Sequence, residues 1–153
     1  LYSSTQAIEE QLVKADLVIG AVLIPGKLAP RLVSKAMLQK MEPGTVLVDA
    51  SIDQGGCFET SRATSHSEPT YVVDGIVHYC VPNIPGACAR TATQALTNAT
   101  MNYIIKLANK GYKQAMREDI HLRRGLNVCL GKVTYPEVAV DLKYTYTPAE
   151  EMI

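Results

Sequence analysis

One stretch constrains the fold of this chain most: Val46-Leu47-Val48-Asp49-Ala50-Ser51-Ile52-Asp53-Gln54-Gly55-Gly56-Cys57. Residues 45–48 are mostly apolar and β-branched and follow Pro43-Gly44, which is typical of a central strand in a parallel sheet. Ligands of open α/β sheets bind beyond the carboxyl ends of such strands. We therefore expect Asp53 at a ligand-binding edge, with Gly55-Gly56 leaving room for a ligand near the main chain. The same residues also fit an ordinary turn without a ligand.

Helix and strand patterns alternate before this stretch. Residues 5–14 follow hydroxyl side chains and place apolar residues on one helical face, and residues 16–22 form an apolar strand that ends at Pro25-Gly26. A helix is expected from Pro30, because apolar residues recur with a period of 3.6 as far as Met41. The order helix, strand, helix, strand predicts an α/β fold, the second half of a doubly wound parallel sheet.

Two strand-forming segments follow a polar loop. Residues 58–69 are irregular and polar, whereas residues 70–81 carry strand-type residues on both sides of Asp74-Gly75. This pattern fits either a hairpin or a single bulged strand. Either alternative ends at Pro82-Asn83-Ile84-Pro85-Gly86, a second loop at a strand end.

The rest of the chain is expected to be mainly helical. A long helix is predicted over about residues 91–110 with Gly111 at its end, followed by a short helical turn at 119–124. Thr134-Tyr135-Pro136-Glu137 has the pattern of a capping box and predicts a helix to about residue 142. Strands and helices are both expected before residue 90, and almost only helices after it. We therefore expect one domain over 1–90 and another over 91–153.

Composition excludes several classes of function. Fifteen basic and fifteen acidic residues cancel, which argues against nucleic acid or an anionic membrane as a partner. No apolar run approaches the roughly 20 residues of a membrane helix, and the first residues do not form a signal peptide. Four cysteines without metal or redox spacing indicate free thiols in a reducing, cytoplasmic setting: Cys57, Cys80, Cys88 and Cys129.

Four blocks of sequence carry a family resemblance: residues 15–26, 48–62, 79–86 and 95–100, which include Asp53-Gln54-Gly55-Gly56. In their order and spacing they resemble alanine dehydrogenases, within the wider alanine dehydrogenase and transhydrogenase nucleotide-binding family. The resemblance extends over essentially the whole chain. It implies the C-terminal part of a longer enzyme whose Gly-x-Gly-x-x-Gly phosphate loop, a motif that this chain lacks, lies upstream.

The resemblance also implies an activity. Residues 1–90 would be the C-terminal half of an NAD-binding Rossmann domain, and residues 91–153 a hinge helix with the C-terminal piece of the substrate domain. The expected reaction is the reversible, NAD-dependent oxidative deamination of L-alanine to pyruvate and ammonium, in a cytoplasmic homohexamer. Without the N-terminal substrate-binding region, the isolated chain is expected to be inactive.

Site residues follow from the same resemblance. Asp53 is implied as a catalytic acid beside the nicotinamide. Cofactor contacts are implied for Asp53 and eleven further residues, which are Ser3, Val22, Leu23, Ala50, Ser51, Ile52, Arg62, Val81, Pro82, Asn83 and Ile84. Core packing, turn formation or a solvated charge are the structural alternatives for these residues. No metal site is expected, because Lys106 and Lys110 stand where some relatives carry Glu and His, and the histidines at 66, 78 and 121 lack ligand spacing.

Two rival interpretations remain open at this level. The first is the NAD-binding domain of a proton-translocating nicotinamide nucleotide transhydrogenase, in which Glu usually precedes Gln-Gly-Gly where this chain has Asp53. The second is a nucleotide-binding or scaffold module without activity of its own. Oxidation of alanine without a second nucleotide distinguishes the dehydrogenase from both.

Overall fold

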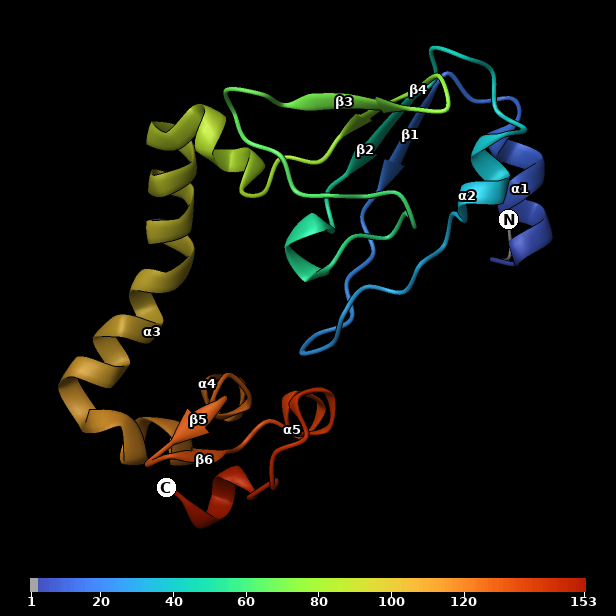
Figure 1. The fold of residues 1–153 in the computed structure, drawn as a ribbon. Helices are drawn as coiled ribbons and strands as arrows, with labels where there is room; N and C mark the ends of the chain where they lie inside the picture. The colour runs from blue at the N-terminus through green and yellow to red at the C-terminus, as the bar shows by residue number, and fades with distance from the viewer. Residues whose placement is uncertain (1–2) are drawn as a thin grey trace. The chain divides into compact units, whose positions relative to one another are not determined.

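The structure is a computed structural model that describes residues 3–153. Its chain forms two compact units. The first contains the residues up to Ile24 together with Leu28–Ala87, and the second contains Pro25–Lys27 and Cys88–Ile153. Figure 1 shows a sheet with two helices in the first unit and a mainly helical second unit.

The first unit is built on a four-stranded sheet in the order β1-β2-β4-β3. The strands are β1 (Leu17–Gly20), β2 (Val46–Asp49), β3 (Thr70–Val73) and β4 (Ile76–Tyr79). β2 pairs in parallel with both β1 and β4, whereas β3 is an antiparallel edge strand. The parallel α/β sheet predicted from the sequence is therefore confirmed, with β2 as an inner strand.

A tight turn joins β3 to β4. Asp74 and Gly75 have φ values of 50° and 83°, and two consecutive positive φ angles match the two-residue turns that suit a twisted hairpin. Of the two alternatives for residues 70–81, the hairpin is correct.

Two helices pack on the sheet. Helix α1 (Thr5–Leu12) begins at Ser4, whose hydroxyl accepts a hydrogen bond from the Ala7 amide at 3.1 Å. Helix α2 (Lys35–Leu38) is much shorter than predicted. Side chains from these helices, β2, β4 and the loops form the apolar core, which includes Leu12, Val33, Met37, Leu38, Met41, Leu47, Cys57, Phe58 and Ile76.

The predicted start of the second helix, at Pro30, is wrong. The backbone before α2 instead runs alongside the segment that follows β2, with Ala29 N bonded to Gln54 O at 2.8 Å and Leu32 N to Cys57 O at 2.7 Å. Val33 also forms a bridge with Phe58. These long-range hydrogen bonds hold residues 29–33 outside any helix, which a periodicity argument does not detect.

Helix α3 (Ala89–Glu118) dominates the second unit and bends at Gly111, which has φ 71° and ψ 159°. The predicted helix end at Gly111 thus marks a real interruption, after which the chain becomes helical again. Two ion pairs span the bend: Lys106 to Asp119 at 2.6 Å, and Lys110 to Glu118. Asp119 also caps the next helix, α4 (Ile120–Arg124).

The remaining elements are short. A hairpin of β5 (Val128–Cys129) and β6 (Lys132–Val133), which the sequence did not reveal, precedes α5 (Pro136–Leu142). The predicted capping box of α5 is wrong, because the Thr134 hydroxyl donates to Leu126 O at 2.8 Å and no side chain caps the helix. A 3-10 turn, η3 (Ala149–Glu151), follows. Across residues 3–153, no helix has the length and apolarity to span a bilayer.

Candidate functional site

Three loops that leave the carboxyl ends of β1, β2 and β4 are joined by hydrogen bonds (Figure 1). The Ala50 amide donates to Gly20 O at 2.8 Å, and the Ser51 hydroxyl donates to Val22 O at 2.8 Å. The Asn83 amide donates to a carboxylate oxygen of Asp53 at 3.4 Å. Because parallel strands end at one edge of a sheet, segments far apart in sequence meet here.

Asp53 lies in the middle of this edge. It belongs to a short 3-10 turn, η1 (Ile52–Gln54), in which Ile52 is buried and Asp53 is exposed. The Asp53 carboxylate is therefore open to a ligand at the carboxyl ends of the strands and is not part of the core. This is the arrangement that a ligand-binding role requires, although a turn Asp would also tolerate it.

The paired glycines give the turn its shape. Gly55 and Gly56 have φ values of 91° and 81°, a region that side chains rarely enter. A Cβ on Gly56 would lie 2.8 Å from a carboxylate oxygen of Asp49 and 2.8 Å from Ser61 Cβ. The second glycine is thus required by both backbone conformation and space.

A second carboxylate, that of Asp49, lies four residues before Asp53 at the end of β2, and sequence reasoning missed its importance. Asp49 is the last residue of β2 and is fully buried. Its carboxylate accepts hydrogen bonds from the Ser51 amide at 3.0 Å, the Cys57 amide at 2.9 Å and the Ser61 hydroxyl at 2.5 Å. The available signal was an ionisable residue at the end of an apolar strand, which needs polar partners when buried.

Gln54 provides a further polar group at this edge. Its side-chain oxygen is buried and has no hydrogen-bond partner among the residues that the structure describes. Buried acceptors are rarely left unpaired in folded proteins. Gln54 directly follows Asp53 in η1, so this acceptor belongs to the same short turn as the exposed Asp53 carboxylate.

The other residues expected at this edge fall into two groups. Leu23, Ala50 and Asn83 are exposed, with Leu23 65% exposed despite its apolar side chain. The buried or half-buried members shape the loops by packing, and these are Val22, Ser51, Ile52, Val81, Pro82 and Ile84. Asn83 adopts φ 53°, an uncommon conformation for a residue with a side chain.

His66 supports the conformation of Asn83, which the sequence did not indicate. Its Nε2 lies 3.2 Å from Asn83 O, so the imidazole donates to this carbonyl. The peptide groups of Asn83 are therefore held on both sides, by His66 at the carbonyl and by Asp53 at the amide.

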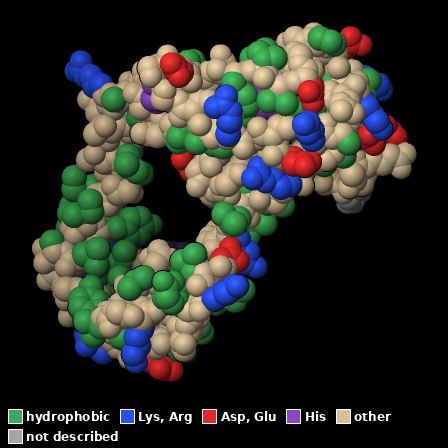
Figure 2. All heavy atoms as spheres, in the orientation of Figure 1, with side chains coloured by type: hydrophobic (Ala, Val, Ile, Leu, Met, Phe, Trp, Pro, Cys, Tyr) green, Lys and Arg blue, Asp and Glu red, His purple; other side chains and the backbone are tan. Residues whose placement is uncertain are grey.

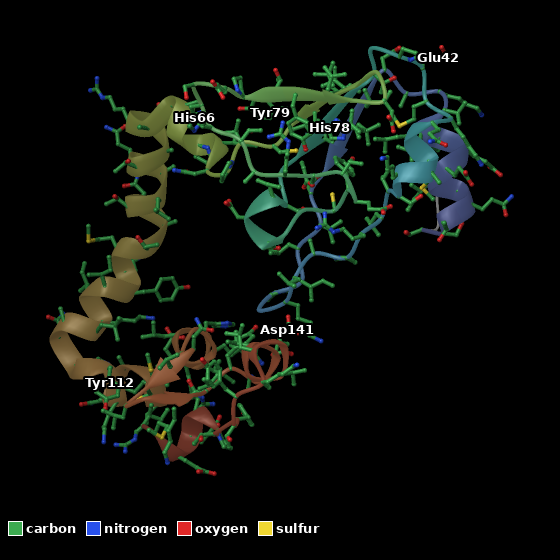
Figure 3. The ribbon with its side chains drawn as sticks, in the orientation of Figure 1. Glu42, His66, His78, Tyr79, Tyr112 and Asp141 are labelled. Atoms are coloured by element: carbon green, nitrogen blue, oxygen red, sulfur yellow. The ribbon has the colours of Figure 1, made fainter. Side chains whose placement is uncertain are left out.

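Arg62 and His78 belong to a separate stack on β3 and β4. The Arg62 guanidinium lies 3.9 Å from the Tyr71 ring centroid, and Tyr71 stacks on His78 with ring centroids 4.9 Å apart. His78 is fully buried among the strands (Figure 3), with ring nitrogens 2.7 Å from Thr60 Oγ1 and 3.0 Å from Ile76 O. Burial lowers the pKa of His78, so a neutral, structural imidazole is favoured.

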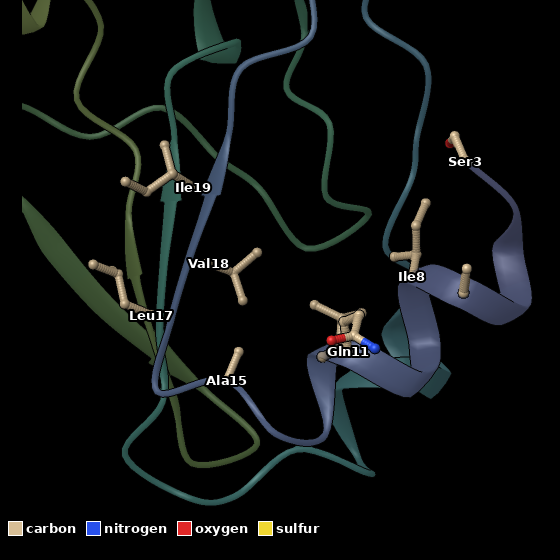
Figure 4. A pocket seen from close by; sticks show the side chains of 9 residues that line it. Ser3, Ile8, Gln11, Ala15, Leu17, Val18 and Ile19 are labelled. Carbon is tan, nitrogen blue, oxygen red and sulfur yellow. The ribbon is translucent and has the colours of Figure 1, made fainter. Parts of the chain in front are cut away.

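Ser3 lies at a different place in the first unit. It lines an apolar pocket of about 430 Å³ between α1 and β1, together with Ile8, Gln11 and Val18. Figure 4 shows Val18 of β1 and Gln11 of α1 on opposite sides of this pocket. Ser3 and Arg62 thus do not take part in the described hydrogen bonds that join the three loops.

The cysteines are free, and the Cys57 thiol is held in its neutral form. All four cysteines are free thiols, and burial, reinforced by the Asp49 charge, raises the pKa of Cys57 to about 12. Residues 3–153 contain no group of three or more His, Cys, Asp or Glu side chains arranged to hold a metal ion.

Comparisons with known proteins agree with this geometry. The family described as "Alanine dehydrogenase/PNT, C-terminal domain" matches residues 1–136. An alanine dehydrogenase of Halomonas elongata is 56% identical over 153 residues, which is 100% of this chain and 41% of the relative. The chain thus spans about two fifths of the length of this curated relative.

Solved structures give the same assignment. An L-alanine dehydrogenase matches with a TM-score of 0.78 and 50% identity over 94% of this chain and 39% of its own. A transhydrogenase from Sinorhizobium meliloti is more distant, with a TM-score of 0.60 and 31% identity over 67% of this chain and 30% of its own. The chain belongs to the alanine dehydrogenase/PNT family and corresponds to its C-terminal domain.

Proposed function

We propose that this chain is the C-terminal part of an NAD-dependent alanine dehydrogenase, which converts L-alanine reversibly to pyruvate and ammonium. The observation that carries this proposal is the exposed Asp53 carboxylate at the junction of three strand-end loops. Residues 1–90 would supply the second half of the NAD-binding domain. Residues 91–153 would supply a hinge helix and part of the substrate domain.

NAD, when bound, supplies the hydride acceptor of the reaction. The residues of this chain would bind and orient it. Asp53 would place a negative charge beside the positively charged ring of the oxidised cofactor. Asn83 would hydrogen-bond the carboxamide or ribose, while Leu23 would cover an apolar face and exclude water.

Two further cofactor contacts are proposed. Ser3, beside the pocket between α1 and β1, would lie near the adenosine. Arg62, whose guanidinium is exposed above Tyr71, would reach the ribose or phosphates.

Assembly and location complete the proposal. Figure 2 shows hydrophobic side chains gathered along α3, where Leu96, Ile104 and Ile105 are each about half exposed or more. Exposed apolar side chains of this kind favour burial against another chain or segment. A homohexamer in the cytoplasm is consistent with this surface and with the free cysteines.

Asp53→Asn in the full-length enzyme tests the proposed site. The substitution removes the charge and keeps the shape, so we expect kcat for alanine oxidation to fall by about 10²–10³-fold, as when one preorganised electrostatic group is lost. Asp74→Asn is the matched control, since Asp74 lies exposed in the β3–β4 turn, where Asn also tolerates positive φ. Near-normal turnover by Asp53→Asn, with an unchanged circular dichroism spectrum, would refute the role.

The rival functions require a different assay. A transhydrogenase transfers hydride between two nucleotides, whereas the proposed enzyme reduces NAD with alanine alone. NAD titration of the 153-residue chain, followed by addition of the upstream part of the enzyme, separates a binding module from an active assembly. Activity only between two nucleotides would favour the transhydrogenase.

A further inference from the structure

The buried Asp49 carboxylate has an unusual set of partners. Its three hydrogen bonds of 3.0 Å or less come from Ser51 N, Cys57 N and Ser61 Oγ. All three donors belong to the turn after β2 or to the loop beyond it, and none belongs to a neighbouring strand. Asp49 therefore stabilises the turn and the loop, while the sheet is held by its own backbone ladder.

The two carboxylate oxygens hold the two ends of the turn. Oδ1 accepts from Ser51 N, and Oδ2 accepts from Cys57 N. Residues 51–57 are thus closed into a loop whose exposed residue, Asp53, lies between the two anchored ends. A change at either anchor alters the backbone on one side of Asp53.

Space around the anchor is restricted. A Cβ at Gly56 would meet Asp49 Oδ2 at 2.8 Å, so no side chain fits between the turn and the carboxylate. A buried charge is costly unless it is fully hydrogen-bonded. An apolar side chain in place of Asp49 would avoid the cost of a buried charge but would leave the turn without its anchor.

We propose that Asp49 is a positioning residue that sets the location of the Asp53 carboxylate through the closed turn 51–57. This inference rests on the proposed function of Asp53 in catalysis. Asp49 itself does not reach the ligand-binding edge, because its side chain is fully buried.

Asp49→Asn in the full-length enzyme tests this proposal. An amide has only one acceptor oxygen, so either Ser51 N–H or Cys57 N–H would face an NH₂ group. We expect kcat to fall by about 10–100-fold, because small misplacements of an active-site group have effects of this size. In an Asp53→Asn background, the same change should lower kcat by less than about twofold.

Thr45→Val is the matched control. Thr45 is buried at the opposite end of the same strand region, and its hydroxyl donates to Glu42 O at 2.7 Å. The substitution removes a hydroxyl that donates to the backbone carbonyls of Glu42 and Ala15, and it leaves the turn untouched. We expect it to lower the unfolding midpoint and to keep kcat within about twofold of wild type.

The outcomes separate the two proposals. Equal losses of kcat from Asp49→Asn in the wild-type and Asp53→Asn backgrounds would overturn the positioning role. So would normal kcat in Asp49→Asn when Asp53→Asn is inactive. Near-normal turnover in Asp53→Asn overturns the proposed role of Asp53, and the positioning role with it.

Ser61→Ala keeps the test decisive if Asp49→Asn does not fold. It removes one donor to Asp49 Oδ2 and retains the charge. We expect a loss of kcat of about 2–10-fold that disappears in the Asp53→Asn background. Unchanged kcat in Ser61→Ala would contradict the proposal.

Discussion

Gly56→Ala is expected to destabilise the chain far more than Gly44→Ala, although both glycines have positive φ. Gly56 has φ 81° and Gly44 has φ 92°. A Cβ on Gly44 would meet nothing within 4 Å, whereas a Cβ on Gly56 would lie 2.8 Å from both Asp49 Oδ2 and Ser61 Cβ. The pair therefore separates the cost of backbone conformation from the cost of a steric clash.

The two costs differ in size. The left-handed backbone costs an L-residue roughly 1–2 kcal/mol, which applies to both variants. Gly56→Ala adds overpacking of roughly 1–3 kcal/mol. It also weakens at least one hydrogen bond to a charged acceptor, worth about 1.5–3 kcal/mol. We therefore expect a loss of roughly 1–2 kcal/mol for Gly44→Ala and about 3.5–8 kcal/mol for Gly56→Ala.

Urea unfolding followed by far-ultraviolet circular dichroism measures both values, since the chain has no tryptophan for fluorescence. The predicted result is a small shift of the midpoint for Gly44→Ala and a large one for Gly56→Ala. Equal shifts would show that the space between Asp49 and Ser61 is not restrictive, and would refute the steric argument.

Two remaining predictions concern buried titratable groups. Burial lowers the pKa of His78 in the folded state, so as the pH falls through about 6.5 the unfolded chain takes up a proton at this site before the folded chain does. The free energy of unfolding, measured by urea titration, should therefore fall as pH decreases from about 6.5. His78→Phe should make this pH dependence shallower, and an unaltered pH dependence in the variant would contradict a neutral, buried His78. Burial raises the pKa of Cys57 to about 12, while Cys88 is exposed. Maleimide at pH 8 should thus label Cys88 rapidly and Cys57 only in denaturant, which mass spectrometry of the labelled peptides measures. Fast labelling of Cys57 in the folded chain would contradict a buried, neutral Cys57 thiol.

Local sequence patterns were sufficient where a structural element depends on its own residues. The Asp74-Gly75 turn predicted a hairpin as one of two alternatives, and the helix end predicted at Gly111 is a bend within α3, which continues to Glu118. Both glycines have positive φ, a conformation that glycine adopts readily because it has no Cβ. The apolar run before Asp49 predicted an inner parallel strand, because a strand that is apolar on both faces is buried on both faces.

Hydrogen bonds to residues outside the predicted element decided the elements that the patterns predicted wrongly. The helix expected from Pro30 begins at Lys35, because residues 29–33 bond to the segment after β2. The capping box expected at Thr134 does not form, because this hydroxyl bonds to Leu126 O. In both cases a hydrogen-bond partner outside the predicted helix competes successfully with the hydrogen bonds of that helix.

The sequence by itself determined the α/β class, the family resemblance and the exposed turn that carries Asp53, because these depend on residue type and order along one short segment. Only the tertiary structure showed that Asp49 anchors the turn, that His66 holds Asn83, and that the Gln54 acceptor is unpaired. The physical reason is that hydrogen-bond partners of buried groups are chosen by proximity in space. Residues 49 and 61, or 66 and 83, become neighbours only after the strands have paired.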